Sequence, residues 1–170
     1  PLLGRLSDLW GFGTGNERVP DKDEINSALN GTGSAIEINE NGIKIPSGTV
    51  LDLGSVGKGI ACDEVRGVLE NSKIKRAVVS VGGSILLYGE GEKFTVGIRD
   101  PFSESSTESF AVLTLPATCV STSGSYERYF DPAGVRYLHI LDPKTGYPAE
   151  SGLVSVTVVC SDGFMSDALS

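Results

Sequence analysis

Hydrophobic and polar positions along the chain predict a few short helices among antiparallel strands. Apolar residues at positions 56, 60, 61, 65, 68 and 69 recur with a helical period. A shorter helix follows Asp21, a candidate N-cap with Glu24 as its capping-box partner and Gly31 as a stop signal. PLLGRLSDLWGFGTG at residues 1–15 joins a helical pattern to a glycine-rich exit, and FMSDALS at residues 164–170 begins a last helix capped by Ser161 or Asp162.

Strand signals fill most of the remaining chain. Residues 34–54 alternate around Asn41-Gly42, which is a strong hairpin signal, and VLDL at residues 50–53 predicts a further strand. KRAVVSVGG predicts a buried strand, SILLYGEGEKFTVGIRDP a hairpin, and GLVSVTVVC a long strand. FAVLTLPATCVSTSG, YERYF and VRYLHIL predict more strands, with DPAG at residues 131–134 as a hairpin turn, and SESSTES at residues 103–109 a mobile loop. Helices inserted among hairpins favour an α+β fold.

Length, charge and cysteine content narrow the class of protein. A chain of 170 residues can form one domain, or two small lobes that share a core, and we expect a single compact unit. The net charge of −8 argues against nucleic-acid binding, and no apolar run is long enough to span a bilayer. Cys62, Cys119 and Cys160 lie far apart in apolar stretches, which favours buried free thiols over a zinc site.

LDLGSVGKGIACD at residues 51–63 combines a strand, a glycine-rich turn and a helix start. Backbone N–H groups at a helix N-terminus favour an anion, so this turn is a candidate phosphate cradle. It is not a Walker A loop, because that motif has four residues between its first glycine and the Gly-Lys pair, whereas two residues separate Gly54 from Gly57 here. The alternative is a tight turn that needs glycine for packing, with Lys58 solvated.

Four further stretches carry candidate chemistry, each with a structural alternative. The glycines of VSVGGSI permit a ligand to approach or mark a β-bulge, and the hydroxyls of VSTSGSYERYF cap a turn or contact a phosphate. His139, the single histidine, shares a predicted strand face with Tyr137 and Leu141 before a rigid Pro/Gly turn, as a base or as a packed residue. Asp167 is a surface charge, or a ligand of a hard cation together with Ser170.

In this order, LDLGSVGKG, VSVGG, VSTSGSYERYF, HILDPKTGYP and SVTVV…DGFMSDALS resemble the ApbE family of FAD:protein FMN transferases. The resemblance implies an ApbE-like fold with antiparallel-rich mixed sheets and a few helices packed around them. It also implies a Mg²⁺-dependent bacterial enzyme that moves FMN from FAD to a Thr or Ser hydroxyl of an acceptor protein and releases AMP. The alternatives are an FAD pyrophosphatase and a non-catalytic FAD-binding module.

The resemblance also assigns residues. By motif match, Asp52, Lys58 and Ile140 contact FAD, His139 is the base, and the Ser55 carbonyl, Asp167 and Ser170 hold the metal ion. We expect residues 1–170 to be a core fragment without an N-terminal segment and without the end of the last helix. We expect the full-length protein to lie outside the cytoplasmic membrane on a lipid anchor. Because an acidic protein repels a pyrophosphate, the hypothesis requires a cation between the last helix and the glycine turn near residue 55.

Overall fold

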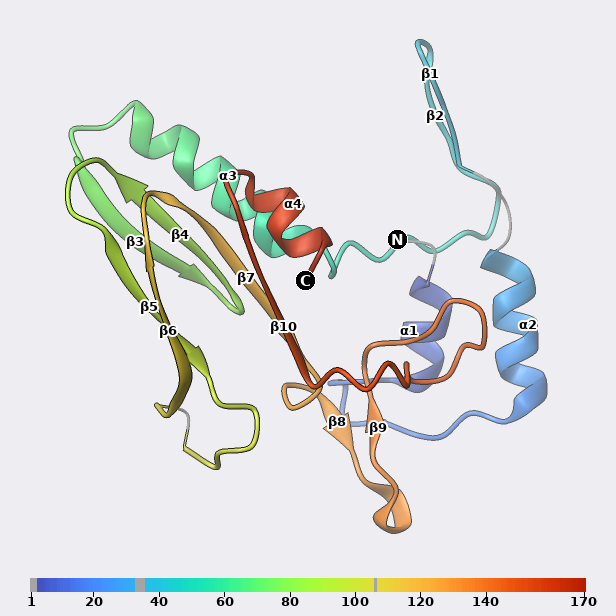
Figure 1. The fold of residues 1–170 in the computed structure, drawn as a ribbon. Helices are drawn as coiled ribbons and strands as arrows, with labels where there is room; N and C mark the ends of the chain where they lie inside the picture. The colour runs from blue at the N-terminus through green and yellow to red at the C-terminus, as the bar shows by residue number, and fades with distance from the viewer. Residues whose placement is uncertain (1–2, 33–35, 106) are drawn as a thin grey trace. The chain divides into compact units, whose positions relative to one another are not determined.

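The computed structural model describes residues 3–32, 36–105 and 107–170, and it is drawn in Figure 1. Parts of three predicted stretches, at residues 1–2, 34–35 and 106, therefore lie outside the described residues. Contacts group the chain into two compact units, Pro1–Leu53 with Ser125–Gly152, and Gly54–Gly124 with Leu153–Ser170. The single domain expected over residues 1–170 stays a prediction.

The elements confirm an α+β chain with antiparallel sheets. The helices are α1 (Gly4–Trp10), α2 (Lys22–Thr32), α3 (Gly57–Glu70), the 3₁₀ turn η1 (Pro132–Gly134) and α4 (Gly163–Ala168). The strands are β1 (Glu37–Asn39), β2 (Gly42–Lys44), β3 (Arg76–Val81), β4 (Ser84–Gly89), β5 (Phe94–Arg99), β6 (Ser109–Leu115), β7 (Thr118–Gly124), β8 (Tyr129–Phe130), β9 (Tyr137–Leu138) and β10 (Ser155–Cys160).

The second unit is built in three layers around the antiparallel sheet β10-β7-β4-β3. Figure 1 shows α3 and α4 side by side, and both helices contact β4 and β7. Leu86 and Cys119, which are paired across β4 and β7, pack with Cys62 of α3. On the other face, Leu87 and Val120 pack with residues of β5, in the two-stranded β5-β6 sheet. The alternation of side chains along β4 and β7 therefore divides the core between the helices and the β5-β6 pair.

Two strand predictions for this unit are wrong in their pairing or burial. β4 and β5 do not form a hairpin, because β4 pairs with β3 and β7 while β5 pairs with β6. β3 is not buried: as the sheet's edge strand it alternates exposed and half-buried residues. Gly82 and Gly83 form the turn between Val81 and Ser84, which pair directly, so the bulge alternative is also wrong. Gly82 takes a φ of 58° in this turn.

The first unit packs around Trp10 at the end of α1. Its indole is fully buried, its Nε1 donates to the Gly146 carbonyl at 2.9 Å, and four rings surround it, those of Phe12, Phe130, Tyr137 and Tyr147. Gly146 ends the predicted rigid turn, where its N–H bonds the Asp142 carbonyl at 2.8 Å. The turn that follows His139 is therefore fastened to the core of the first unit.

The capping box of α2 forms as predicted. The Glu24 N–H bonds Asp21 Oδ1 at 2.8 Å, and Glu24 Oε2 accepts from the Asp21 N–H at 3.0 Å. Hydrogen bonds from Arg18 lower the pKa of the Glu24 carboxyl to about 2. The β1-β2 hairpin around Asn41-Gly42 and the β8-β9 hairpin around η1 are also confirmed.

Two strand predictions in the first unit are wrong. Residues 50–53 form no strand, although VLDL has a strand-like composition. β9 ends at Leu138, so His139 lies in a bend rather than on a strand face with Leu141, which only bridges to Pro148. The turn chemistry of Asp142 to Gly146 takes over before the strand pattern finishes.

The three cysteines are free thiols, with Cys62 and Cys119 buried and Cys160 half-buried. Desolvation raises the pKa of the Cys62 thiol to about 11 and also raises that of Cys119.

No helix in the described part of the chain is both long and apolar enough to cross a membrane.

We expect Cys160 to be alkylated first, and Cys62 to react about 100-fold more slowly than an ordinary thiol at pH 8, because its thiolate fraction falls tenfold per pKa unit. Iodoacetamide labelling followed by peptide mass spectrometry measures this order. Labelling of Cys62 at the rate of Cys160 would contradict the packing of α3 on the sheet.

Candidate functional site

A candidate site forms in the second unit where α3 and α4 cross at two glycines. A Cβ atom on Gly59 would overlap the Gly163 carbonyl oxygen and lie 2.7 Å from the Asp167 Cβ, and one on Gly163 would lie 2.5 Å from the Gly59 oxygen. Only glycine permits this approach. Gly59 interrupts a helical pattern, which is a sequence signal for such packing.

Two aspartates fix the start of α4. Of the two predicted caps, Ser161 and Asp162, the N-cap is Asp162, and its Oδ1 accepts from the Met165 N–H at 2.8 Å. Asp63, one turn along α3 from Gly59, accepts from the N–H groups of Gly163 and Phe164 at 2.8 Å each. Sequence reasoning missed Asp63, because a carboxylate on one helix gives no signal that it caps another.

Asp167 is buried, so the surface-charge alternative for it is wrong; its side chain is only 2% exposed. Its Oδ2 accepts from the Gly59 N–H at 2.9 Å, and its Oδ1 lies 3.0 Å from Lys58 Nζ. The first turn of α3 thus does hold an anion, as its dipole favours. At the Gly59 N–H, that anion is a carboxylate of this same chain.

Three buried serine hydroxyls form a hydrogen-bonded chain that ends on this carboxylate. Ser84 Oγ donates to Asp167 Oδ1 at 3.4 Å, Ser121 Oγ donates to Ser84 Oγ at 2.9 Å, and Ser121 and Ser166 share a hydrogen bond of 2.8 Å. All three serines are at most 1% exposed. Ser121 lies within strand β7, as the strand pattern of FAVLTLPATCVSTSG predicts, and period-2 alternation directs it to the face that Cys119 shares. Ser84 and Ser166 were not predicted as site residues.

Ser170 and the glycine turn lie beside this cluster. Ser170 Oγ donates to the Asp167 carbonyl at 3.0 Å and shares a hydrogen bond of 2.9 Å with Ser123. Ser55 lies in the exposed turn before α3. The Lys58 ammonium donates to the carbonyl oxygen of Gly54, the residue before Ser55, at 3.4 Å. The last helix and the glycine turn are therefore joined, as the sequence hypothesis requires.

The oxygens around Lys58 Nζ fit a hard cation. The ammonium nitrogen is itself a stand-in cation between a carboxylate oxygen and a carbonyl oxygen, the donor types that Mg²⁺ takes. No cluster of three or more His, Cys, Asp or Glu side chains stands ready for a metal within the described ranges. A set with one carboxylate still suits Mg²⁺, which keeps waters and uses substrate phosphates as ligands.

The other predicted site residues belong to the first unit. Asp52 is half-buried, and its Oδ2 accepts from Ser7 Oγ at 3.1 Å. Ile140 is 40% exposed. His139 Nδ1 lies 3.0 Å from the Arg128 carbonyl oxygen, which can only accept, so Nδ1 carries a proton and a neutral ring has its lone pair on Nε2.

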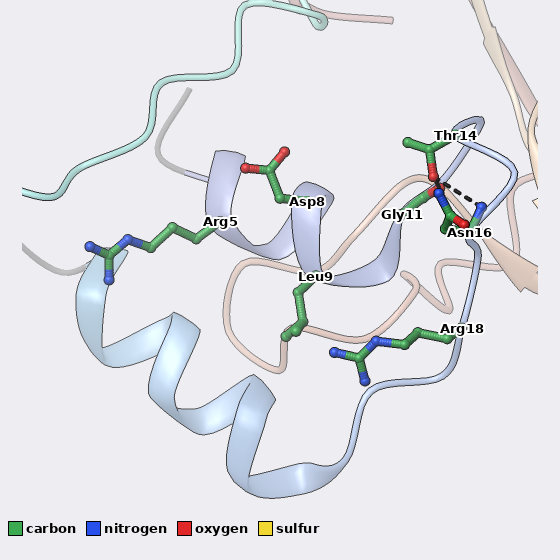
Figure 2. A pocket seen from close by; sticks show the side chains of 7 residues that line it. All are labelled: Arg5, Asp8, Leu9, Gly11, Thr14, Asn16 and Arg18. Atoms are coloured by element: carbon green, nitrogen blue, oxygen red, sulfur yellow. Dashed lines mark hydrogen bonds between the residues drawn. The ribbon is translucent and has the colours of Figure 1, made fainter.

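A separate hollow of about 710 Å³ opens in the first unit beside α1 (Figure 2). Its two guanidinium groups are already bonded, Arg18 to Glu24 at 2.7 Å and Arg5 to the Gly48 carbonyl. None of the predicted site residues lines it. The lining residues are Arg5, Asp8, Leu9, Gly11, Thr14, Asn16 and Arg18.

Comparison with solved structures shows that the chain has the fold of the flavin transferases. The ApbE protein of Thermotoga maritima has a TM-score of 0.89 and 37% identity, covering 100% of this chain and 57% of that one. The apo flavinyl transferase ApbE of Pseudomonas stutzeri has a TM-score of 0.79 and 32% identity, covering 99% and 54%.

The ApbE family model matches residues 1–170, and the chain belongs to the ApbE family. A Klebsiella pneumoniae (strain 342) protein named FAD:protein FMN transferase is 36% identical over 169 residues, which is 97% of this chain and 52% of that protein. A Rhodobacter capsulatus protein of the same name is 35% identical over 175 residues, covering 99% and 33%. This chain thus spans about half the length, or less, of these curated relatives.

Proposed function

We propose that the protein of which this chain is part transfers the FMN moiety of FAD to a threonine or serine hydroxyl of an acceptor protein and releases AMP. The observation that carries the proposal is the family match over residues 1–170, with relatives named FAD:protein FMN transferase. The buried Asp167 carboxylate beside a cation supports it, because phosphoryl transfer depends mainly on positioning and electrostatics.

In the proposed reaction, the acceptor hydroxyl attacks the FMN phosphorus of FAD. A phosphoester bond to the hydroxyl oxygen forms, the pyrophosphate bond to AMP breaks, and the hydroxyl proton passes to His139. The tautomer set by the Arg128 carbonyl leaves the lone pair on Nε2 for that proton. Asp52, Lys58 and Ile140 are the proposed FAD contacts.

Asp167, Ser170 and the Ser55 carbonyl are the proposed ligands of Mg²⁺. When bound, the ion would supply positive charge to the phosphate oxygens as the pyrophosphate bond breaks. The chain's own contribution is to hold Asp167 still, through the Gly59 amide and the Ser84 hydroxyl. For the full-length protein we propose a lipid-anchored location outside the cytoplasmic membrane, which rests on the family resemblance alone.

Incubation with FAD, Mg²⁺ and a threonine-bearing acceptor peptide tests the function. We expect AMP release together with a peptide mass increase equal to FMN less water. AMP release without that mass increase would assign the protein as an FAD pyrophosphatase. FAD that stays bound and intact with Mg²⁺ present would make it a non-catalytic binding module.

We expect His139→Ala to slow transfer by about 10²- to 10⁴-fold, the usual contribution of a general base. The measurement is the rate of peptide flavinylation from pH 6 to 9, with FAD binding measured separately. A variant as fast as the parent protein across that range would make His139 a structural residue.

A further inference from the structure

The ammonium group of Lys58 lies between two oxygens of the second unit. Its Nζ lies 3.0 Å from Asp167 Oδ1 and 3.4 Å from the Gly54 carbonyl oxygen. The Asp167 side chain is 2% exposed and that of Lys58 is 34% exposed, so the pair joins a buried anion to a cation that reaches it from the surface. The lysine stem passes close to Gly82, where an added Cβ would lie 3.2 Å from Lys58 Cδ.

A buried carboxylate needs a compensating charge, because an unpaired ion in the interior is strongly destabilising. Lys58 is the cation that the described residues place on Asp167, assisted by the neutral donors Gly59 N–H and Ser84 Oγ. The oxygen that it contacts is the one toward which a divalent ion would also be drawn. Two cations held by one oxygen repel each other at short range, so the ammonium and the metal ion compete.

We propose that Lys58 is the resident counter-cation of Asp167 in the metal-free protein, and that a divalent ion binds by displacing its ammonium group. The inference rests on the proposed function only in taking Asp167 as a metal ligand. Displacement also changes what Lys58 can do: a released ammonium on a flexible, partly exposed stem becomes available to an anionic group such as a diphosphate. Metal binding and the lysine's contact with substrate are then linked through one carboxylate.

Binding of Mn²⁺ in the absence of FAD, followed by the EPR signal of the free ion, tests the competition. We expect Lys58→Met, which keeps the stem and removes the charge, to bind Mn²⁺ about tenfold more tightly than the parent chain. Lys58→Arg keeps a competing cation and should show no gain. Lys73→Met is the matched control, since Lys73 is an exposed lysine beyond the far end of α3, about 20 Å along the helix.

Equal or weaker Mn²⁺ binding by Lys58→Met would overturn the proposal. If neither the parent chain nor Lys58→Met binds Mn²⁺, both the displacement and the metal ligands of the proposed function are refuted. The outcome of the flavinylation assay does not depend on the outcome of this experiment, so the two proposals can fail separately. A loss of FMN transfer with intact competition would leave the Lys58 proposal standing.

NMR of the lysine ammonium groups gives a second measurement on the unaltered chain, in case Lys58→Met does not fold. An ammonium held by two oxygens exchanges slowly with water, so we expect a Lys58 signal in the metal-free protein, assigned by its absence in Lys58→Arg. Saturating Mg²⁺ should shift or remove this signal. A Lys58 signal unaffected by saturating Mg²⁺ would refute the displacement.

Discussion

Replacing Asp167 by asparagine is expected to lower the rate of FMN transfer by about 10³-fold, which corresponds to roughly 4 kcal/mol of transition-state stabilisation. Asparagine keeps the shape of the side chain but removes the negative charge that pairs with Lys58 and is proposed to hold Mg²⁺. The measurements are the flavinylation rate as a function of Mg²⁺ concentration and circular dichroism to establish folding.

Asp162→Asn is the matched control, because it removes a carboxylate from the start of the same helix. Asparagine caps helices as well as aspartate does, so α4 should form and transfer should continue at the parent rate. Full activity of Asp167→Asn at limiting Mg²⁺ would contradict the role proposed for Asp167. Equal losses in both variants would instead point to a general disturbance of α4.

Gly59→Ala is expected to destabilise the second unit by about 3 kcal/mol, since a methyl group cannot fit between the two crossing helices. The added Cβ would overlap the backbone of Gly163 and crowd the Asp167 Cβ at 2.7 Å, and backbone cannot rotate away as a side chain can. For a chain of this size the melting temperature should fall by roughly 10 °C. Thermal and denaturant unfolding measure the change.

Gly67→Ala provides the comparison on the same helix. A Cβ on Gly67 meets no atom within 4 Å, so alanine should stabilise α3 by about 0.5–1 kcal/mol through its higher helix propensity. The two variants are expected to change stability in opposite directions. A neutral Gly59→Ala would show that α3 and α4 do not cross as closely as described.

Sequence patterns located helices and turns well because those signals act over a few residues. The Asp21–Glu24 capping box, the Asn41-Gly42 hairpin and the Asp162 cap all join neighbours in sequence, and all three form. Two strand predictions failed in the first unit, for different reasons. At His139 the strand pattern yields to the following turn, and at residues 50–53 a strand-like composition finds no pairing partner among the described strands.

Strand pairing and burial were less predictable. β4 and β5 follow each other in sequence and carry strong strand patterns, yet each pairs elsewhere, because β4 is hydrogen-bonded on both edges by β3 and β7. β3 is apolar enough for a sheet centre and lies at an edge. The hydrophobicity of a residue indicates that it can be buried, but the strands that pack beside it determine whether it is buried.

For the candidate site, the sequence by itself supplied Lys58, Asp167, Ser170 and the glycine turn, through motifs and a family resemblance. It could not show that Lys58 holds Asp167, that Asp63 caps α4, or that Ser84 and Ser121 lie under the carboxylate. Such contacts join residues far apart in the chain, as the sequence separation of 108 between Gly59 and Asp167 illustrates. Propensity and capping are decided by neighbouring residues. The charge balance of a buried carboxylate is decided only when packing removes it from water and selects the groups that remain within hydrogen-bonding distance.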